Sequence, residues 1–119
     1  MEINFNEIAR EIFEGNKRRG FTENEIGTDL MLIVSELGEA LEADRKSKYA
    51  DAQSYRLAGD TFIKENFECF IKDTLEDEIA DAIIRLLDFV GRRGIDIDFH
   101  ITEKLKYNET RAFKHGKNY

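Results

Sequence analysis

The sequence contains no proline and only one cysteine, and each shortage narrows the possible structures. Cys69 alone cannot form an intrachain disulfide, so nothing indicates an oxidising compartment and we expect a cytoplasmic protein. No stretch approaches the roughly 20 apolar residues of a membrane span, and the first residues do not combine a basic segment with an apolar run. We therefore expect neither secretion nor membrane insertion.

Two families of catalytic motif are also missing. The chain has no Gly-x-x-x-x-Gly-Lys-Ser/Thr segment, which excludes the phosphate-binding loop of P-loop enzymes. His100 and His115 do not stand at Glu-x-x-His spacing, which excludes the di-iron carboxylate bundle.

The chain has fewer basic than acidic residues. The 18 Lys and Arg residues face 25 Asp and Glu residues, and the formal net charge is −7. This balance disfavours nucleic acid polymers and anionic membranes as partners. The length of 119 residues is that of one compact domain spanning residues 1–119.

Apolar residues recur at helical rather than alternating spacing, which predicts an all-α protein. The absence of proline removes the strongest helix breaker. Asn4 is a plausible N-cap of the first helix, and residues 22–25 and 74–77 read as capping boxes. Residues 45–59 are polar and weakly periodic, so we expect a connection there. The apolar segments predict helices over residues 5–13, 30–41, 62–71, 75–90 and from about 98 onward, which together make a four- to five-helix bundle.

Two segments carry the same acidic pattern. Residues 36–40 read Glu-Leu-Gly-Glu-Ala, and residues 78–82 read Glu-Ile-Ala-Asp-Ala. Carboxylates three residues apart share one side of a helix, and the small residues beside them allow another helix to approach closely. Packed side by side, the two helices would bring four acids together, and these are Glu36, Glu39, Glu78 and Asp81. Such an oxygen-only set suits Mg²⁺ or Mn²⁺, with positions left open for water and phosphate.

A simpler interpretation also fits these acids. Acidic pairs at this spacing are usually solvated helix surface, and Asp81 with Arg85 has the spacing of an ordinary ion pair within one helix. The alternative is therefore a non-catalytic helical interaction or oligomerisation module with an acidic surface. Leu32, Ala40 and Ala43 flank the first acidic pair, away from the stripe of larger apolar residues that includes Leu30. They favour a partly buried site.

These motifs resemble a known family. The segments Ser-Glu-Leu-Gly-Glu-Ala-Leu-Glu-Ala and Asp-Glu-Ile-Ala-Asp-Ala-Ile-Ile-Arg-Leu-Leu-Asp are similar to the two halves of the metal signature of MazG-like all-α nucleoside triphosphate pyrophosphohydrolases. Lys104, Asn108 and Arg111 are similar in type and spacing to the residues that hold substrate on the last helix of that family. The likeness extends from about residue 26 onward. It departs from the family at Ser35, where many members have Glu, and in a longer connection between the acidic pairs.

The resemblance implies an enzyme that cleaves a nucleoside or deoxynucleoside triphosphate between its α and β phosphates, releasing the monophosphate and pyrophosphate. It implies a Mg²⁺ site at the four acids, with Mn²⁺ as a substitute, and a water-activating role for Glu36 or Glu39. A relative that hydrolyses phosphoribosyl-ATP is the alternative within this class. We expect a homodimer or homotetramer, because helices this short leave little room to enclose a nucleotide.

Overall fold

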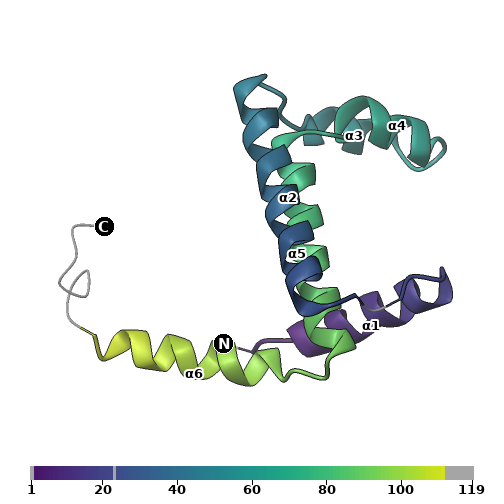
Figure 1. Ribbon diagram of the computed structural model, residues 1–119. Coiled ribbons are helices and arrows are strands. Elements are labelled where there is room, and N and C mark those ends of the chain that lie inside the picture. Colours follow the sequence, from purple (N-terminus) through teal and green to yellow (C-terminus); the bar gives the residue numbers. More distant parts are fainter. Residues whose placement is uncertain (1, 23, 112–119) are drawn as a thin grey trace. The chain divides into compact units, whose positions relative to one another are not determined.

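The computed structural model describes residues 2–22 and 24–111, and within these ranges the chain is entirely helical, without a strand. The helices are α1 (Phe5–Arg18), α2 (Ile26–Arg45), α3 (Ala52–Ala58), α4 (Ile63–Phe70), α5 (Leu75–Arg92) and α6 (Ile97–Glu109) (Figure 1). The all-α prediction is confirmed. Over the same ranges, none of the helices has both the length and the apolar character to cross a membrane.

Of the two predicted capping boxes, the structure supports the one at Thr74 and contradicts the one at Thr22. Thr74 precedes α5, and its Oγ1 accepts a hydrogen bond from the backbone N–H of Asp77 at 3.3 Å, as the sequence predicts. The prediction of a capping box at Thr22 is wrong. Helix α2 begins only at Ile26, with Glu25 in the N-cap position and no side-chain cap bond.

The segment predicted as a connection contains a helix of its own, so the described chain has more helices than the four or five expected. The side chain of Asp51 accepts a hydrogen bond from the Ser54 N–H at 3.0 Å and starts α3. Helix α3 packs on α4, where the rings of Tyr55 and Phe67 meet edge to face with centroids 6.3 Å apart. Tertiary contact therefore stabilises a segment that is too polar and too short to be recognised as a helix from periodicity.

The helices form two compact units. The first unit contains α1, the end of α5 from Leu87 onward, and α6; the second spans residues 23–86.

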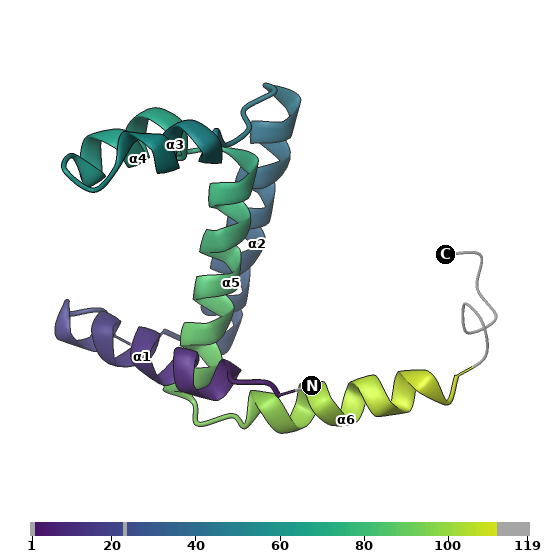
Figure 2. The ribbon, with the colours of Figure 1, turned by 180° about the vertical axis from the view of Figure 1, so that it is seen from behind.

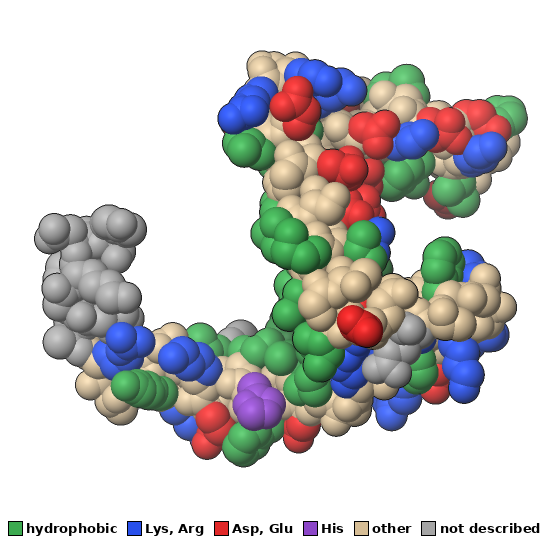
Figure 3. Space-filling model, in the orientation of Figure 1, with side chains coloured by type: hydrophobic (Ala, Val, Ile, Leu, Met, Phe, Trp, Pro, Cys, Tyr) green, Lys and Arg blue, Asp and Glu red, His purple; other side chains and the backbone are tan. Residues whose placement is uncertain are grey.

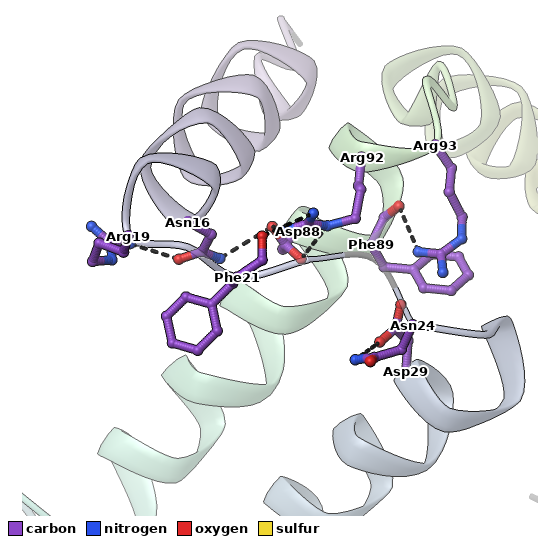
Figure 4. A network of polar contacts seen from close by, with 9 residues as sticks. All are labelled: Asn16, Arg19, Phe21, Asn24, Asp29, Asp88, Phe89, Arg92 and Arg93. Atoms are coloured by element: carbon purple, nitrogen blue, oxygen red, sulfur yellow. Dashed lines mark hydrogen bonds and ion pairs between the residues drawn. The ribbon is translucent and has the colours of Figure 1, made fainter.

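In the first unit, α1 and α5 approach each other closely at a glycine. A Cβ atom on Gly91 would lie 2.5 Å from the carbonyl oxygen of Ala9, which is 2% exposed, so a larger residue does not fit. Further along this contact, the Asn16 amide donates to the Asp88 carboxylate at 3.1 Å, and Arg92 donates to the same carboxylate at 3.3 Å (Figure 4). The polar network fixes the register of the two helices.

The N-termini of α1 and α6 cap each other. Asn4, the predicted cap of α1, forms no side-chain cap bond. Instead the Asp98 carboxylate accepts hydrogen bonds from the backbone N–H groups of Phe5 at 2.8 Å and Asn6 at 3.2 Å. The Asn6 side-chain oxygen in turn accepts from the Ile97 N–H at 2.9 Å. Each helix thus satisfies free N–H groups of the other.

The second unit is organised by α2 and α5, which run antiparallel (Figure 2). The Leu75 N–H donates to the Lys48 carbonyl at 2.9 Å at one end, and Arg85 donates to Glu36 at 2.8 Å further along both helices. The residues buried on these helices include Ile33, Ala40, Ala43 and Ala82. Small side chains in this contact let the backbones come close.

The longest apolar stripe of α2 lies outside this contact. Leu30, Val34, Leu37 and Leu41 are 43–53% exposed, although such a stripe normally marks the face that a helix packs against its own chain. Only Ile33, at the edge of the stripe, is buried. Helix α2 therefore packs on α5 through the face that carries its acids and alanines.

Candidate metal centre

Three of the four predicted acids converge between α2 and α5. Glu36 of α2 and Glu78 and Asp81 of α5 each offer a carboxylate oxygen, and these oxygens lie within 4.8 Å of one another. Glu78 is 6% exposed and the Glu36 side chain 12%. Among the described residues, Glu36 Oε2 and Glu78 Oε2 are buried without a hydrogen-bond partner. Buried polar atoms normally have one, so these two oxygens need an explanation.

Glu39, the fourth predicted acid, stands at the rim. It is exposed and lines a hollow of about 250 Å³ together with Glu78, Lys46 and Lys48. Lys46 and Lys48 belong to no motif in the sequence, and they are the basic residues that line this hollow. Lys46 lies 3.5 Å from the Glu42 carboxylate, so it already balances one acid there.

Two carboxyls of the cluster, Glu78 and Asp81, hold their protons more tightly than isolated carboxyls do. Burial raises the pKa of Glu78 from 4.5 to about 7, and hydrogen bonding with Glu39 and the negative charge beside it add to the effect. Burial also raises the pKa of Asp81, with the charge of Asp77 as the next cause. A carboxyl group that retains its proton can donate a hydrogen bond to a neighbouring carboxylate. A metal cation would displace that proton and take its place.

Arg85 partly neutralises the cluster from one side. Burial is the largest single cause and acts to raise the pKa of Glu36. The hydrogen bond and charge of Arg85, together with hydrogen bonding to Glu39 and Glu78, outweigh it, so the pKa is lowered. The sequence offered Asp81 as the partner of Arg85; the hydrogen bond, at 2.8 Å, goes to Glu36 on the other helix. Arg85 is 44% exposed along its side chain.

A second acidic group shares one member with the first. Carboxylate oxygens of Asp73, Asp77 and Glu78 also lie within 4.8 Å of one another. Asp77 accepts a hydrogen bond from the Asp73 N–H at 3.0 Å, which explains part of this proximity as helix capping. From the sequence, Asp77 is predicted only as part of a capping box. The closeness of three acids along the chain, at positions 73, 77 and 78, is the sequence feature that indicates this group.

An apolar hollow of about 490 Å³ adjoins the acids. Phe67 and Ile71 line it from the α4 side and Ile84 from α5, while Asp77 and Asp81 stand in its wall. Asp81 therefore borders both the acidic triad and an apolar space large enough for a planar ring.

The three residues predicted to bind substrate belong to the first unit. Lys104 and Asn108 lie exposed on α6, and Arg111 follows two residues after its end. The Lys104 Nζ atom lies 5.0 Å from the centre of the Tyr107 ring, and the Arg111 Cζ atom 5.4 Å from it. The aromatic ring thus holds two cations on one side of the helix.

The donor set fits a hard divalent cation. All its atoms are carboxylate oxygens, two of them are buried without a protein donor, and no histidine or cysteine is among them. Mg²⁺ and Mn²⁺ prefer such ligands.

A scan against protein-family models found no match to this chain, and searches of curated proteins and of solved structures found none either. The likeness to MazG-like enzymes therefore depends on the acidic pairs and on the residues of α6.

Proposed function

We propose that this chain is a Mg²⁺-dependent, MazG-like hydrolase that converts a nucleoside or deoxynucleoside triphosphate and water into the monophosphate and pyrophosphate. The observation that carries the proposal is the pair of buried, unpartnered oxygens on Glu36 and Glu78, with Asp81 within 4.8 Å of both residues. A protein tolerates an unsatisfied acidic cluster of this kind at a cost in stability, which a bound cation would offset.

In this proposal the four acids have two roles, which are to hold the metal and to orient the attacking water. Glu36, Glu78 and Asp81 hold the metal from the buried side, and Glu39 completes the set from the rim. Mg²⁺ held by these acids would neutralise phosphate charge and lower the pKa of an attacking water. Glu39 is exposed at the hollow, so we assign it the role of orienting the attacking water and accepting its proton. Arg85 keeps Glu36 in place beside it.

Cations of the chain would hold the phosphates. Lys46 and Lys48 line the hollow next to Glu39, and we assign Lys104 and Arg111 the same role on α6, with Asn108 bonding sugar or phosphate. In a chain of net charge −7, a triphosphate requires such local positive charge.

The base of the nucleotide would enter the apolar hollow beside Asp81. Phe67 offers a ring for stacking, and Ile71 and Ile84 exclude water around it. Phe67→Ala should therefore raise KM more than it lowers kcat.

The test is incubation of the purified chain with Mg²⁺ and a panel of ribo- and deoxynucleoside triphosphates, oxidised and deaminated ones and phosphoribosyl-ATP included. Chromatography should show equal amounts of monophosphate and pyrophosphate from at least one of them. Glu39→Gln should lower kcat by about 100-fold or more, on the scale of losing one directly acting group. Glu68→Gln, which changes an exposed acid 3.9 Å from Lys64, should not. No cleavage of any triphosphate with Mg²⁺ or Mn²⁺ contradicts the proposal.

One observation favours the non-catalytic module instead. The Arg85 guanidinium, 2.8 Å from Glu36, already gives the acids a cation from the protein itself. A purely structural cluster of this kind would not need a metal. Thermal melting with and without Mg²⁺ separates the two, because a ligand that binds only the folded state at a hundred times its Kd adds about 2.7 kcal/mol.

A further inference from the structure

We propose that the apolar hollow beside Asp81 selects a base with an exocyclic amino group, such as cytosine or adenine, over uracil, thymine and hypoxanthine. This selectivity deepens the proposed function and rests on it, because it names the class of nucleotide that the hollow of about 490 Å³ would admit. The side chains that line the hollow, and the hydrogen bonds that they already make, are the observations behind it.

The polar side chains in the wall of this hollow are all carboxylates. Among the described residues that line it, the acids are Glu76, Asp77 and Asp81, and the others are alanine, phenylalanine and isoleucine. An ionised carboxylate accepts hydrogen bonds and donates none. A base that enters the hollow therefore meets side-chain acceptors and no side-chain donor from these residues.

The hollow lies between one face of α5 and the end of α4. The residues that line it from the middle of α5 recur at helical spacing and share one face, and they are Asp77, Ala80, Asp81 and Ile84. Phe67, which is 37% exposed, lines it from α4. Figure 3 shows acidic and hydrophobic side chains together where α5 meets α3 and α4. A base held there lies within reach of the acids, because Ala80 is too small to separate it from them.

Of the three acids, Asp77 is the one assigned to the base. Its Oδ2 accepts a hydrogen bond from the Asp73 N–H at 3.0 Å, and a carboxylate accepts at both oxygens, so Oδ1 keeps the capacity to accept. Glu76 is exposed at the rim, where its Oε1 accepts from the Ala50 N–H at 3.0 Å. Asp81 is a metal ligand in the proposed function. Asp77 is half-buried between them.

Amino and keto bases interact with such a wall in opposite ways. The amino group of cytosine or adenine donates hydrogen bonds, and Asp and Glu side chains accept from the N4 amino group of cytosine when proteins read DNA bases. Uracil and hypoxanthine carry a carbonyl oxygen in place of that amino group, and its lone pairs would face carboxylate oxygens. A site that lacks a donor for the carbonyl leaves it unpaired and therefore rejects the keto base.

Nucleoside binding tests the hollow without any cleavage. Ligand-observed NMR titrations of the full chain in EDTA compare cytidine with uridine and adenosine with inosine, two pairs in which a carbonyl replaces the amino group. Each amino nucleoside should bind with a Kd about tenfold or more below that of its keto counterpart, on the scale of one specific contact to a base edge. Equal binding within each pair overturns the proposal, and so does the failure of all four nucleosides to bind.

An amide at position 77 should remove the preference. Asp77→Asn keeps the shape of the side chain and an oxygen for the Asp73 N–H, but its NH₂ group donates to a carbonyl. The ratio of the two Kd values in each pair should fall to about one. Asp60→Asn is the matched control, since Asp60 is exposed and lies outside the lining of the hollow. A ratio that Asp77→Asn leaves unchanged overturns the proposal.

A second variant keeps the test decisive if Asp77→Asn does not fold, which circular dichroism checks. Ala80→Leu fills the hollow with a good helix former and should weaken the binding of all four nucleosides by about tenfold or more. Unchanged binding would overturn the proposal, because the base would then lie elsewhere.

Turnover separates this selectivity from the proposed function itself. With Mg²⁺, kcat/KM for CTP should exceed that for UTP by about tenfold or more, and the same holds for ATP over ITP. Cleavage of all four with equal kcat/KM overturns the selectivity and leaves the proposed function standing. A preference for amino nucleosides without cleavage of any triphosphate supports the selective hollow and contradicts the proposed function.

Discussion

Replacing Glu78 by glutamine should stabilise the metal-free protein at alkaline pH and leave its stability almost unchanged near pH 4, below the ordinary pKa of the carboxyl group. Burial and the neighbouring acids raise the pKa of Glu78 from 4.5 to about 7. Between these two values the unfolded chain has already lost the proton while the folded chain retains it, so the free energy of unfolding falls as the pH rises. Glutamine keeps the shape of the side chain without the charge and removes this loss.

The expected size follows from the pKa difference. A change from 4.5 to about 7 corresponds at full strength to roughly 3 kcal/mol at 1.36 kcal/mol per unit. The hollow beside Glu39 and Glu78 opens to solvent, which screens the cluster and reduces the effect to about 1–2 kcal/mol. In a chain of this length that is a rise in Tm of about 4–8 °C.

The assay is urea and thermal unfolding of wild type and Glu78→Gln in EDTA at about pH 4 and pH 8.5. Glu68→Gln changes an exposed acid in the same unit. The change in unfolding free energy that it causes, relative to wild type, should be the same at both pH values. Adding Mg²⁺ at pH 8.5 should reverse the order, because the wild type gains the ligand's binding energy and the variant has lost a ligand. Equal destabilisation by Glu78→Gln at both pH values would refute the reasoning, since it would mean that the carboxyl group makes favourable contacts.

Three further substitutions test other parts of the structure. Arg85→Gln should lower stability by about 0.5–1 kcal/mol, because Glu36 loses its partner, and the loss should shrink on adding Mg²⁺; urea titrations in both conditions measure it. Asp98→Ala should cost about 1 kcal/mol by uncapping α1, seen as a lower urea midpoint with an unchanged slope. Gly91→Ala should lower the free energy of unfolding by roughly 1–3 kcal/mol, because its Cβ would meet the Ala9 carbonyl. Gly38 has open space around it, so Gly38→Ala should not destabilise the protein. Thermal melts compare the two variants.

Local signals in the sequence predicted much of the candidate site. Acids three residues apart, bracketed by Gly or Ala, identified Glu36, Glu78 and Asp81, and the structure brings their oxygens within 4.8 Å. The same spacing grouped Glu39 with them, yet Glu39 lies exposed at the rim of the hollow. The orientation of a side chain at the edge of a helix contact depends on where the two helices cross, which spacing does not determine. The spacing suggested Asp81 as one possible partner of Arg85, whereas the hydrogen bond goes to Glu36, because spacing within one helix cannot indicate a partner on another helix.

The sequence by itself determined that the described chain is all helix, where α5 begins and which residues carry the acids, because these depend on neighbours within about one turn. Only the tertiary structure decided which face of α2 packs inward. Both faces of that helix are apolar enough to be buried, and periodicity does not say whether a stripe meets its own chain or another. Ala40 and Ala43 settle the choice, because small side chains allow α5 close enough to bury them and the acids beside them. The larger leucines are left at the surface, and partners far along the chain, such as Asp98 for α1, become visible only in the fold.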